Sequence, residues 1–272
     1  MRCFLIGLVS LLLSMEIWAS MSINQSLSNQ EYLKHGKELY GQSCIGCHGE
    51  KGDGNGPGSV FLNPKPRDFT KGIFKFSSAP LGYLPTDADL IRTITRGLHG
   101  TSMPNFRLLS ENSKTSLIEY IKTFSEAWKD PTKRKEPTQG APFPADDFGN
   151  HAKFIARAQK GRTLFLENCM VCHGAKGHGD GEGGMELSDE WGNAIKPANL
   201  TKSSIKSGSS VKDIYRTVMN GLNGTPMVSY KDTITDDGLW DLSAYVLYLR
   251  GLNSGLYGSN PPIKEFTPEE TK

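Results

Sequence analysis

The chain has 272 residues, of which 37% are hydrophobic and 22% are charged, and its formal net charge is +2 at pH 7. This composition is typical of a globular protein with one large or two ordinary domains, and it excludes a disordered chain. The near balance of charge gives no indication of nucleic-acid binding. Five cysteines are present, and four of them fall in two short motifs.

Residues 1–20 have the pattern of a secretory signal peptide. Arg2 precedes an apolar run from Phe4 to Leu13, and Ile17-Trp18-Ala19-Ser20 offers a cleavage region. An uncleaved membrane anchor is the alternative, but Glu16 interrupts the apolar stretch, which is short for a membrane span. We therefore expect an exported protein in the periplasm of a bacterium. Cleavage would also remove the fifth cysteine, Cys3.

Residues 44–48 have the sequence Cys-Ile-Gly-Cys-His, and residues 169–173 have the sequence Cys-Met-Val-Cys-His. Two cysteines separated by two residues and followed by histidine are the signature of covalent haem attachment. Each thiol adds to one vinyl group of the porphyrin, and the histidine binds the iron as proximal ligand. We therefore predict two covalently attached haem c groups, at Cys44, Cys47 and His48 and at Cys169, Cys172 and His173.

The two motifs belong to two copies of one longer pattern, which indicates a gene duplication. Gly36-Lys37-Glu38-Leu39-Tyr40 before the first motif matches Gly161-Arg162-Thr163-Leu164-Phe165 before the second. The second copy carries an insertion that contains Met185 and Trp191. We expect a first domain at residues 21–128, a second at 151–252, a proline-rich and charged linker at 129–150, and a C-terminal tail at 253–272.

Each copy predicts the same set of helices, and we expect an all-α fold with long loops. One helix leads into the attachment motif. A second begins near Thr86 or Ser210, each followed three residues later by an aspartate (Asp89 or Asp213), which approximates a capping box. A third covers about residues 112–124 or 236–250, where apolar residues recur at helical spacing.

A methionine follows each attachment motif at a similar distance. Met103 lies in Gly-Thr-Ser-Met-Pro and Met227 in Gly-Thr-Pro-Met. A thioether is a soft ligand that raises the reduction potential of haem iron, and the shared loop favours this role over core packing. His99 is an alternative ligand in the first copy, but its counterpart is Asn223. We predict His48 and Met103 as axial ligands of one iron, and His173 and Met227 as those of the other.

A zinc site built from the four cysteines is an alternative. It would leave both histidines, both methionine loops and the export signal unexplained. A thioredoxin-like pair would need a βαβ context, which the sequence does not contain. We reject both alternatives.

Each copy resembles a class I c-type cytochrome domain, and the chain from Glu31 to Leu252 resembles the tandem dihaem cytochromes c. The resemblance implies that an N-terminal and a C-terminal helix cross in each domain, with Gly36 and Tyr40 against Tyr120, and Gly161 and Phe165 against Tyr245.

The resemblance also implies a proline whose carbonyl accepts a hydrogen bond from the proximal histidine, a role matched by Pro66 and Pro197. Arg92 and Arg216 occupy equivalent positions before the methionine loops. They either pair with haem propionates or are solvated helix residues.

If histidine and methionine occupy both axial positions of each iron, neither haem has an open position for a substrate; we call such a haem closed. Two closed haems favour an electron-transfer protein that is not itself an enzyme. We expect it to exchange single electrons with redox partner proteins, such as a respiratory oxidoreductase or other cytochromes, either free or as a subunit that associates peripherally with a membrane-bound complex. The alternative is a dihaem enzyme such as a peroxidase or a thiosulfate-oxidising cytochrome. Such an enzyme would need an open or differently ligated iron, whereas both copies here keep methionine.

Overall fold

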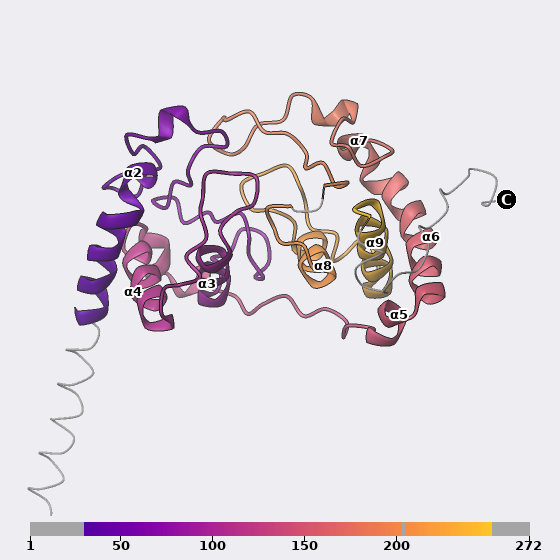
Figure 1. The fold of residues 1–272 in the computed structure, drawn as a ribbon, viewed down its shortest axis with the longest axis horizontal. Coiled ribbons are helices and arrows are strands. Elements are labelled where there is room, and N and C mark those ends of the chain that lie inside the picture. The colour runs from indigo at the N-terminus through magenta and orange to yellow at the C-terminus, as the bar shows by residue number, and fades with distance from the viewer. Residues whose placement is uncertain (1–29, 203–204, 252–272) are drawn as a thin grey trace, which may run out of the picture.

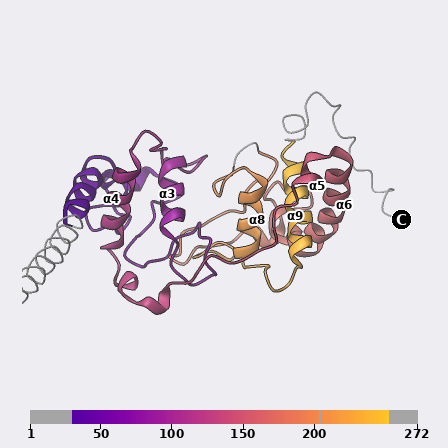
Figure 2. The same ribbon diagram turned by 90° about the horizontal axis from the view of Figure 1, so that it is seen from below.

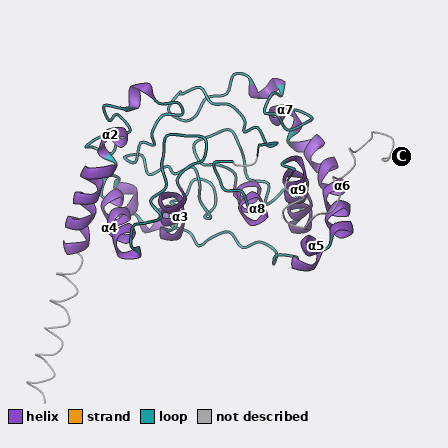
Figure 3. Ribbon diagram, in the orientation of Figure 1, coloured by secondary structure: helices purple, strands orange, loops and turns teal. Residues whose placement is uncertain are grey.

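The structure is a computed structural model that describes residues 30–202 and 205–251. The predicted signal peptide at 1–20, Cys3 and the tail at 253–272 lie outside these residues. Regular elements in the described ranges are helices, with one isolated antiparallel bridge between Ser188 and Ala194 in place of a sheet (Figure 3). The all-α prediction is confirmed.

The first half consists of helices joined by long loops. Residues 30–43 are helical and lead into the attachment motif. The elements that follow are α2 (Ile45–His48), η1 (Ser59–Phe61), α3 (Asp87–Arg96), α4 (Glu111–Lys122) and η2 (Glu126–Lys129).

The second half repeats this order. After η3 (Pro131–Lys133) come α5 (Ala145–Gly149), α6 (His151–Asn168), α7 (Met170–His173), η4 (Glu182–Gly184), α8 (Val211–Asn220) and α9 (Asp236–Leu249). Helix α6 corresponds to the helix at residues 30–43, and α8 and α9 correspond to α3 and α4. The predicted third helices differ from α4 and α9 by only one or two residues at their ends, where helices commonly fray.

A glycine lies at the crossing of the first and last helices in each half. A Cβ atom on Gly36 would lie 2.0 Å from the backbone oxygen of Ser116 in α4. A Cβ atom on Gly161 would lie 1.9 Å from the backbone oxygen of Asp241 in α9. Only glycine permits such close approach of two helix backbones, so the predicted crossings are present.

An aromatic pair supports each crossing. The ring centroids of Tyr40 and Tyr120 are 5.4 Å apart, and those of Phe165 and Tyr245 are 5.2 Å apart. Both pairs are tilted, as aromatic rings in protein cores prefer. The predicted partners are therefore correct in both halves.

Capping boxes begin α3 and α8. The Thr86 hydroxyl accepts a hydrogen bond from the backbone N–H of Asp89, whose carboxylate accepts one from the backbone N–H of Thr86. Ser210 and Asp213 repeat this exchange. Each box satisfies N–H groups that have no partner within the helix, and both sequence predictions are confirmed.

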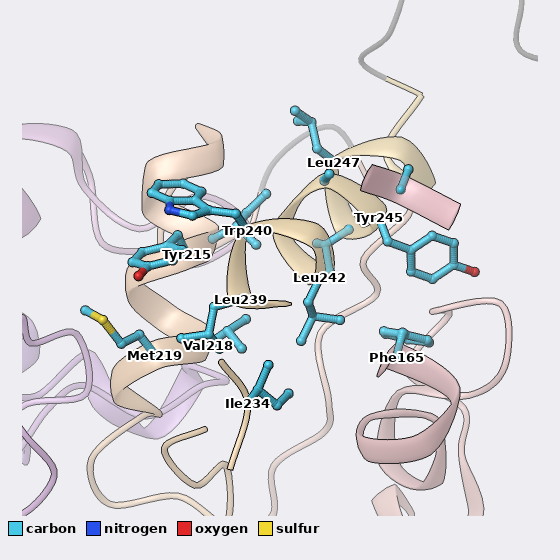
Figure 4. Packing of buried hydrophobic residues seen from close by; sticks show 14 of the residues in the cluster. Phe165, Tyr215, Val218, Met219, Ile234, Leu239, Trp240, Leu242, Tyr245 and Leu247 are labelled. Carbon is cyan, nitrogen blue, oxygen red and sulfur yellow. The ribbon is translucent and has the colours of Figure 1, made fainter. Parts of the chain in front are cut away.

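Each half has its own hydrophobic core. In the second, Leu239 and Leu242 of α9 are fully buried, and the ring of Trp240 stacks on that of Tyr215 at 3.7 Å (Figure 4). The first core has at its centre Tyr40, Leu117 and Ile118, which are at most 2% exposed.

The end of the predicted linker belongs to the second core. Residues 145–149 form α5, and Phe148 is only 6% exposed because it packs against Phe154 and Trp240. The proline-rich composition of residues 129–150 therefore describes the start of this segment better than its end.

Helices α3 and α8 are the helices of the two halves that lie nearest the centre of the molecule, with loops between them (Figures 1 and 2). Arg96 of α3 forms an ion pair with Asp213 of α8 at 3.0 Å. The backbone N–H of Gly82 donates to Asn223 Oδ1 at 2.8 Å. None of the described helices is long and apolar enough to cross a membrane.

Candidate haem sites

The two attachment motifs have the same conformation. In the first, the backbone N–H of His48 donates to the carbonyl of Cys44 at 2.9 Å. In the second, the N–H of His173 donates to the carbonyl of Cys169 at 2.9 Å. This single helical turn brings both thiols and the imidazole of each motif close together. The four described cysteines form no disulfides with one another.

A loop backbone holds each proximal histidine ring in place. The Nδ1 atom of His48 lies 3.0 Å from the carbonyl oxygen of Arg67, and that of His173 lies 3.1 Å from the carbonyl oxygen of Ala198. When Nδ1 donates its proton to such a carbonyl, the Nε2 lone pair is free to bind a metal, and the ring orientation is fixed.

These contacts correct the predicted role of Pro66 and Pro197, because the accepting carbonyl belongs to the next residue along the chain. The proline carbonyls lie elsewhere. A Cβ atom on Gly54 would be 2.8 Å from the oxygen of Pro66, and one on Gly179 would be 2.6 Å from that of Pro197. The prolines thus pack against the glycine-rich loops and place the following residue under the histidine.

Burial lowers the pKa of His48 and of His173, although the hydrogen bond to the backbone carbonyl acts in the opposite direction in each case. Both imidazoles are therefore neutral at neutral pH. A neutral imidazole is the form that binds a metal.

The thiol of the first cysteine in each pair does not readily lose its proton. Burial, and then the neighbouring cysteine of the same pair, raise the pKa of Cys44 to about 11 and that of Cys169 to about 12. A thiol oxidoreductase needs a lowered thiol pKa, so the environment of these pairs does not suit that chemistry. Among the described residues, no three His, Cys, Asp or Glu side chains gather in a way that could hold a zinc ion.

A cavity of about 540 Å³ brings together the predicted ligands of the first half. Cys44, Cys47 and His48 form part of its wall, and Met103 forms another part. Phe69 stacks on the His48 ring at 4.5 Å. The remaining wall is largely apolar, with Phe74, Leu90, Ile94, Leu98 and Phe106 among its members.

This cavity fits haem c in its chemistry, and its volume lies within the ordinary range of cofactor sites. It offers two thiols and a neutral imidazole next to one another, a thioether, and an apolar lining of the kind that surrounds bound cofactors.

The methionine loops are closed by the same hydrogen bonds in both halves. The N–H of Leu98 donates to the carbonyl of Met103 at 3.1 Å, and that of Leu222 donates to the carbonyl of Met227 at 3.0 Å. Met103 lines the first cavity, whereas His99 is exposed and lies outside its wall. The assignment of Met227 to the second iron stays a prediction that rests on the matching loop.

Arg92 and Arg216 do not line the first cavity. Each pairs with the capping-box carboxylate of its own helix, Arg92 with Asp89 and Arg216 with Asp213. Both arginines therefore hold an ion pair in the α3–α8 region, which does not fit the alternative of a solvated helix face. Contact of either arginine with haem propionates stays a prediction.

The sequence did not predict that the second half contributes to the first cavity. Trp191 and Lys206 from the second half form part of its wall, together with Asp189, Asn193 and Ile195. The only indication in the sequence was the insertion that contains Trp191. Where this insertion lies in the structure depends on how the two halves pack together.

Two families of known proteins match the two halves. Residues 31–121 match the family "Cytochrome C oxidase, cbb3-type, subunit III", and residues 158–250 match the family "Cytochrome c". The matches are consecutive and include both attachment motifs.

Individual relatives extend over most of the chain. It is 23% identical over 250 residues to the cbb3-type cytochrome c oxidase subunit CcoP of Azospirillum brasilense, covering 86% of this chain and 68% of that protein. It is 25% identical over 224 residues to the cbb3-type cytochrome c oxidase subunit FixP of Azorhizobium caulinodans, covering 79% of this chain and 59% of that protein. This chain thus spans only part of both relatives.

A solved structure is more similar. A chain of the Kuenenia stuttgartiensis reducing HAO-like protein complex Kustc0457/Kustc0458 is 37% identical, with a TM-score of 0.70. The match covers 79% of this chain and 95% of that chain.

Proposed function

This chain belongs to the c-type cytochromes and carries two cytochrome c domains in tandem, and we propose on this basis that it carries single electrons between redox proteins in the bacterial periplasm. Cytochrome c domains bind haem c covalently, and haem iron supplies one-electron redox chemistry. The proposal includes two haems per chain, one at each attachment motif.

The observation that carries the proposal is the cavity of the first half, whose wall contains Cys44, Cys47, His48 and Met103. Histidine and methionine together would occupy both axial positions of the iron. A closed iron exchanges electrons without binding a substrate, and neutral Met/His ligation suits a carrier of relatively high potential.

The second site supports the same function through its equivalence with the first. His173 has the same backbone acceptor geometry as His48, and Met227 lies in the same closed loop as Met103. Because both copies keep methionine, neither iron is distinguished as a reaction centre. We therefore propose a carrier in preference to a peroxidase or a thiosulfate-oxidising enzyme.

We propose that the partners are proteins of a respiratory oxidoreductase, to which this chain docks as a subunit or as a mobile carrier. The relatives above are described as oxidase subunits and as part of an HAO-like complex. Val171, inside the second attachment motif, is 62% exposed, and Val228, next to Met227, is 55% exposed. Exposed apolar residues beside a redox centre suit the small interfaces of transient redox encounters.

Spectroscopy of the purified, exported protein tests this proposal. A pyridine haemochrome assay should give two haems c per chain. The oxidised protein should show the long-wavelength methionine-to-iron charge-transfer band for both haems and no high-spin component. A high-spin haem, or a band of half the expected intensity, would instead favour the enzymatic alternative.

A further inference from the structure

Four Lys or Arg side chains line the first haem cavity: Lys65, Arg67 and Lys75 from the first half, and Lys206 from the second. The ammonium group of Lys65 donates to the backbone carbonyls of Ser59 and Val60, so the argument below concerns the other three. Arg67 and Lys75 are half-buried, and Lys206 is more exposed. Lys75 and Lys206 occupy equivalent positions in the two copies, nine residues after Pro66 and Pro197 respectively. Two copies of one lysine therefore come close together where the halves meet.

These cations are close enough to disfavour one another. Burial, followed by the charges of Lys206 and Arg67, lowers the pKa of Lys75 to about 8. Burial also lowers the pKa of Arg67 and of Lys206. Among the residues that the structure describes, none of the three has a carboxylate partner within 4.0 Å.

Asp68 and Asp189 also line the cavity, and their charges act on Arg67, but both carboxylates already accept other hydrogen bonds. Asp68 accepts hydrogen bonds from Thr70, and from Trp191 Nε1 at 3.3 Å. Asp189 accepts from the backbone N–H groups of Trp191 and Asn193. The cavity therefore presents positive charge that the protein does not neutralise by direct pairing, as expected where an anionic ligand completes the site.

Trp191 holds this region together across the two halves. Its ring lies 4.2 Å below the guanidinium carbon of Arg67, a cation–π contact. A Cβ atom on Gly224, in the loop that contains Met227, would lie 3.0 Å from the same ring. Trp191 thus orients Arg67 from the second half. The second copy has Ala198 in place of Arg67, so it lacks an arginine at this position.

We infer that Arg67, Lys75 and Lys206 form a carboxylate-binding site for the propionates of the first haem, and that the second half completes this site through Lys206 and Trp191. The inference rests on the proposed function, because it requires haem in the first cavity. It makes the two haem sites unequal: the electrostatics of the first haem depend on residues of the second domain.

The test is a redox titration of the full-length dihaem protein and its Lys206→Gln variant. A cation near haem stabilises the reduced iron, so its removal should favour the oxidised form of the first haem by about threefold to tenfold. A tenfold change corresponds to a potential about 59 mV lower for a one-electron couple. Lys206→Arg should restore the original potential because it keeps the charge.

Lys202→Gln is the matched control. Lys202 is exposed, carries the same charge four residues away and does not line the cavity. Each haem gives one transition in the titration. Both lysine variants are also made together with Met227→His, which should lower the reduction potential of the second haem and so separate its transition from that of the first. Redox-difference infrared spectra should also show a shift of propionate carboxylate bands in Lys206→Gln but not in Lys202→Gln.

The inference is overturned if Lys206→Gln shifts the potential no more than Lys202→Gln does, or if the shift falls on the second haem. Failure of the proposed function has a different signature. The unmodified protein would then lack two reversible one-electron waves, irrespective of any lysine variant.

Discussion

At the scale of single residues, the site separates the groups that attach haem from those that set its properties. The thiols and imidazoles come from two single helical turns, but the orientation of each imidazole comes from a carbonyl in a distant loop, at Arg67 or Ala198. Such a contact fixes the ring and increases the basicity of the nitrogen that faces the metal. Whether the methionine binds the iron then determines whether the second axial position is occupied or open.

Met103→Ala should open the first haem without releasing it, because the covalent bonds to Cys44 and Cys47 do not depend on the thioether. We expect carbon monoxide to bind one haem per chain in the reduced variant, measured by absorption titration. Leu108→Ala, at a residue that is 94% exposed, is the control and should bind none. A Met103→Ala protein that stays closed would show that another residue is the ligand.

At the scale of elements, the crossing of the first and last helices fixes the position of each attachment motif. The motif follows directly after the helix that carries Gly36 or Gly161, so any separation of the helices would move the thiols. The backbone contact at each glycine leaves no room for a side chain.

Gly36→Ala should therefore destabilise the first half, by about 1–3 kcal/mol as is usual for overpacking. Gly41→Ala lies in the same helix, with no atom within 4 Å of its new Cβ, and should be neutral or stabilise by about 0.5–1 kcal/mol. Chemical denaturation of the two variants measures the difference. Equal stabilities would mean that the helices do not cross at Gly36.

Local patterns allowed much of this to be predicted from the sequence. The attachment motifs, the capping boxes at Thr86 and Ser210 and the methionine loops each depend on neighbouring residues. The accepting carbonyl was placed one residue too early, at Pro66 and not at Arg67, because register within an irregular loop leaves no periodic signal. The position of Trp191 depends on docking between the halves, which no local pattern encodes.

At the scale of the whole molecule, the two halves are joined by charged and polar contacts near α3 and α8. Asp213 is central: it caps α8, pairs with Arg216 and reaches Arg96 of the other half. Burial alone would raise the pKa of Asp213, but the hydrogen bond from Ser210 and the charges of the two arginines outweigh it, so the pKa lies below its ordinary value.

Because its pKa is lowered in the folded state, Asp213 stabilises the protein above the pKa it has when unfolded. That contribution disappears as the pH falls through the lower pKa of the folded state. Thermal unfolding between about pH 6 and pH 2 should therefore show a smaller loss of stability in Asp213→Asn than in the unmodified protein. The variant should be less stable at neutral pH, and parallel pH profiles would contradict the assignment.

The central claim is that both haems are closed by histidine and methionine and serve electron transfer. Addition of carbon monoxide to the fully reduced, unmodified dihaem protein tests it most directly. We predict that neither haem binds the gas, while both are oxidised and reduced reversibly by one electron each. Ready binding of carbon monoxide at either haem would show an open iron and would contradict the account.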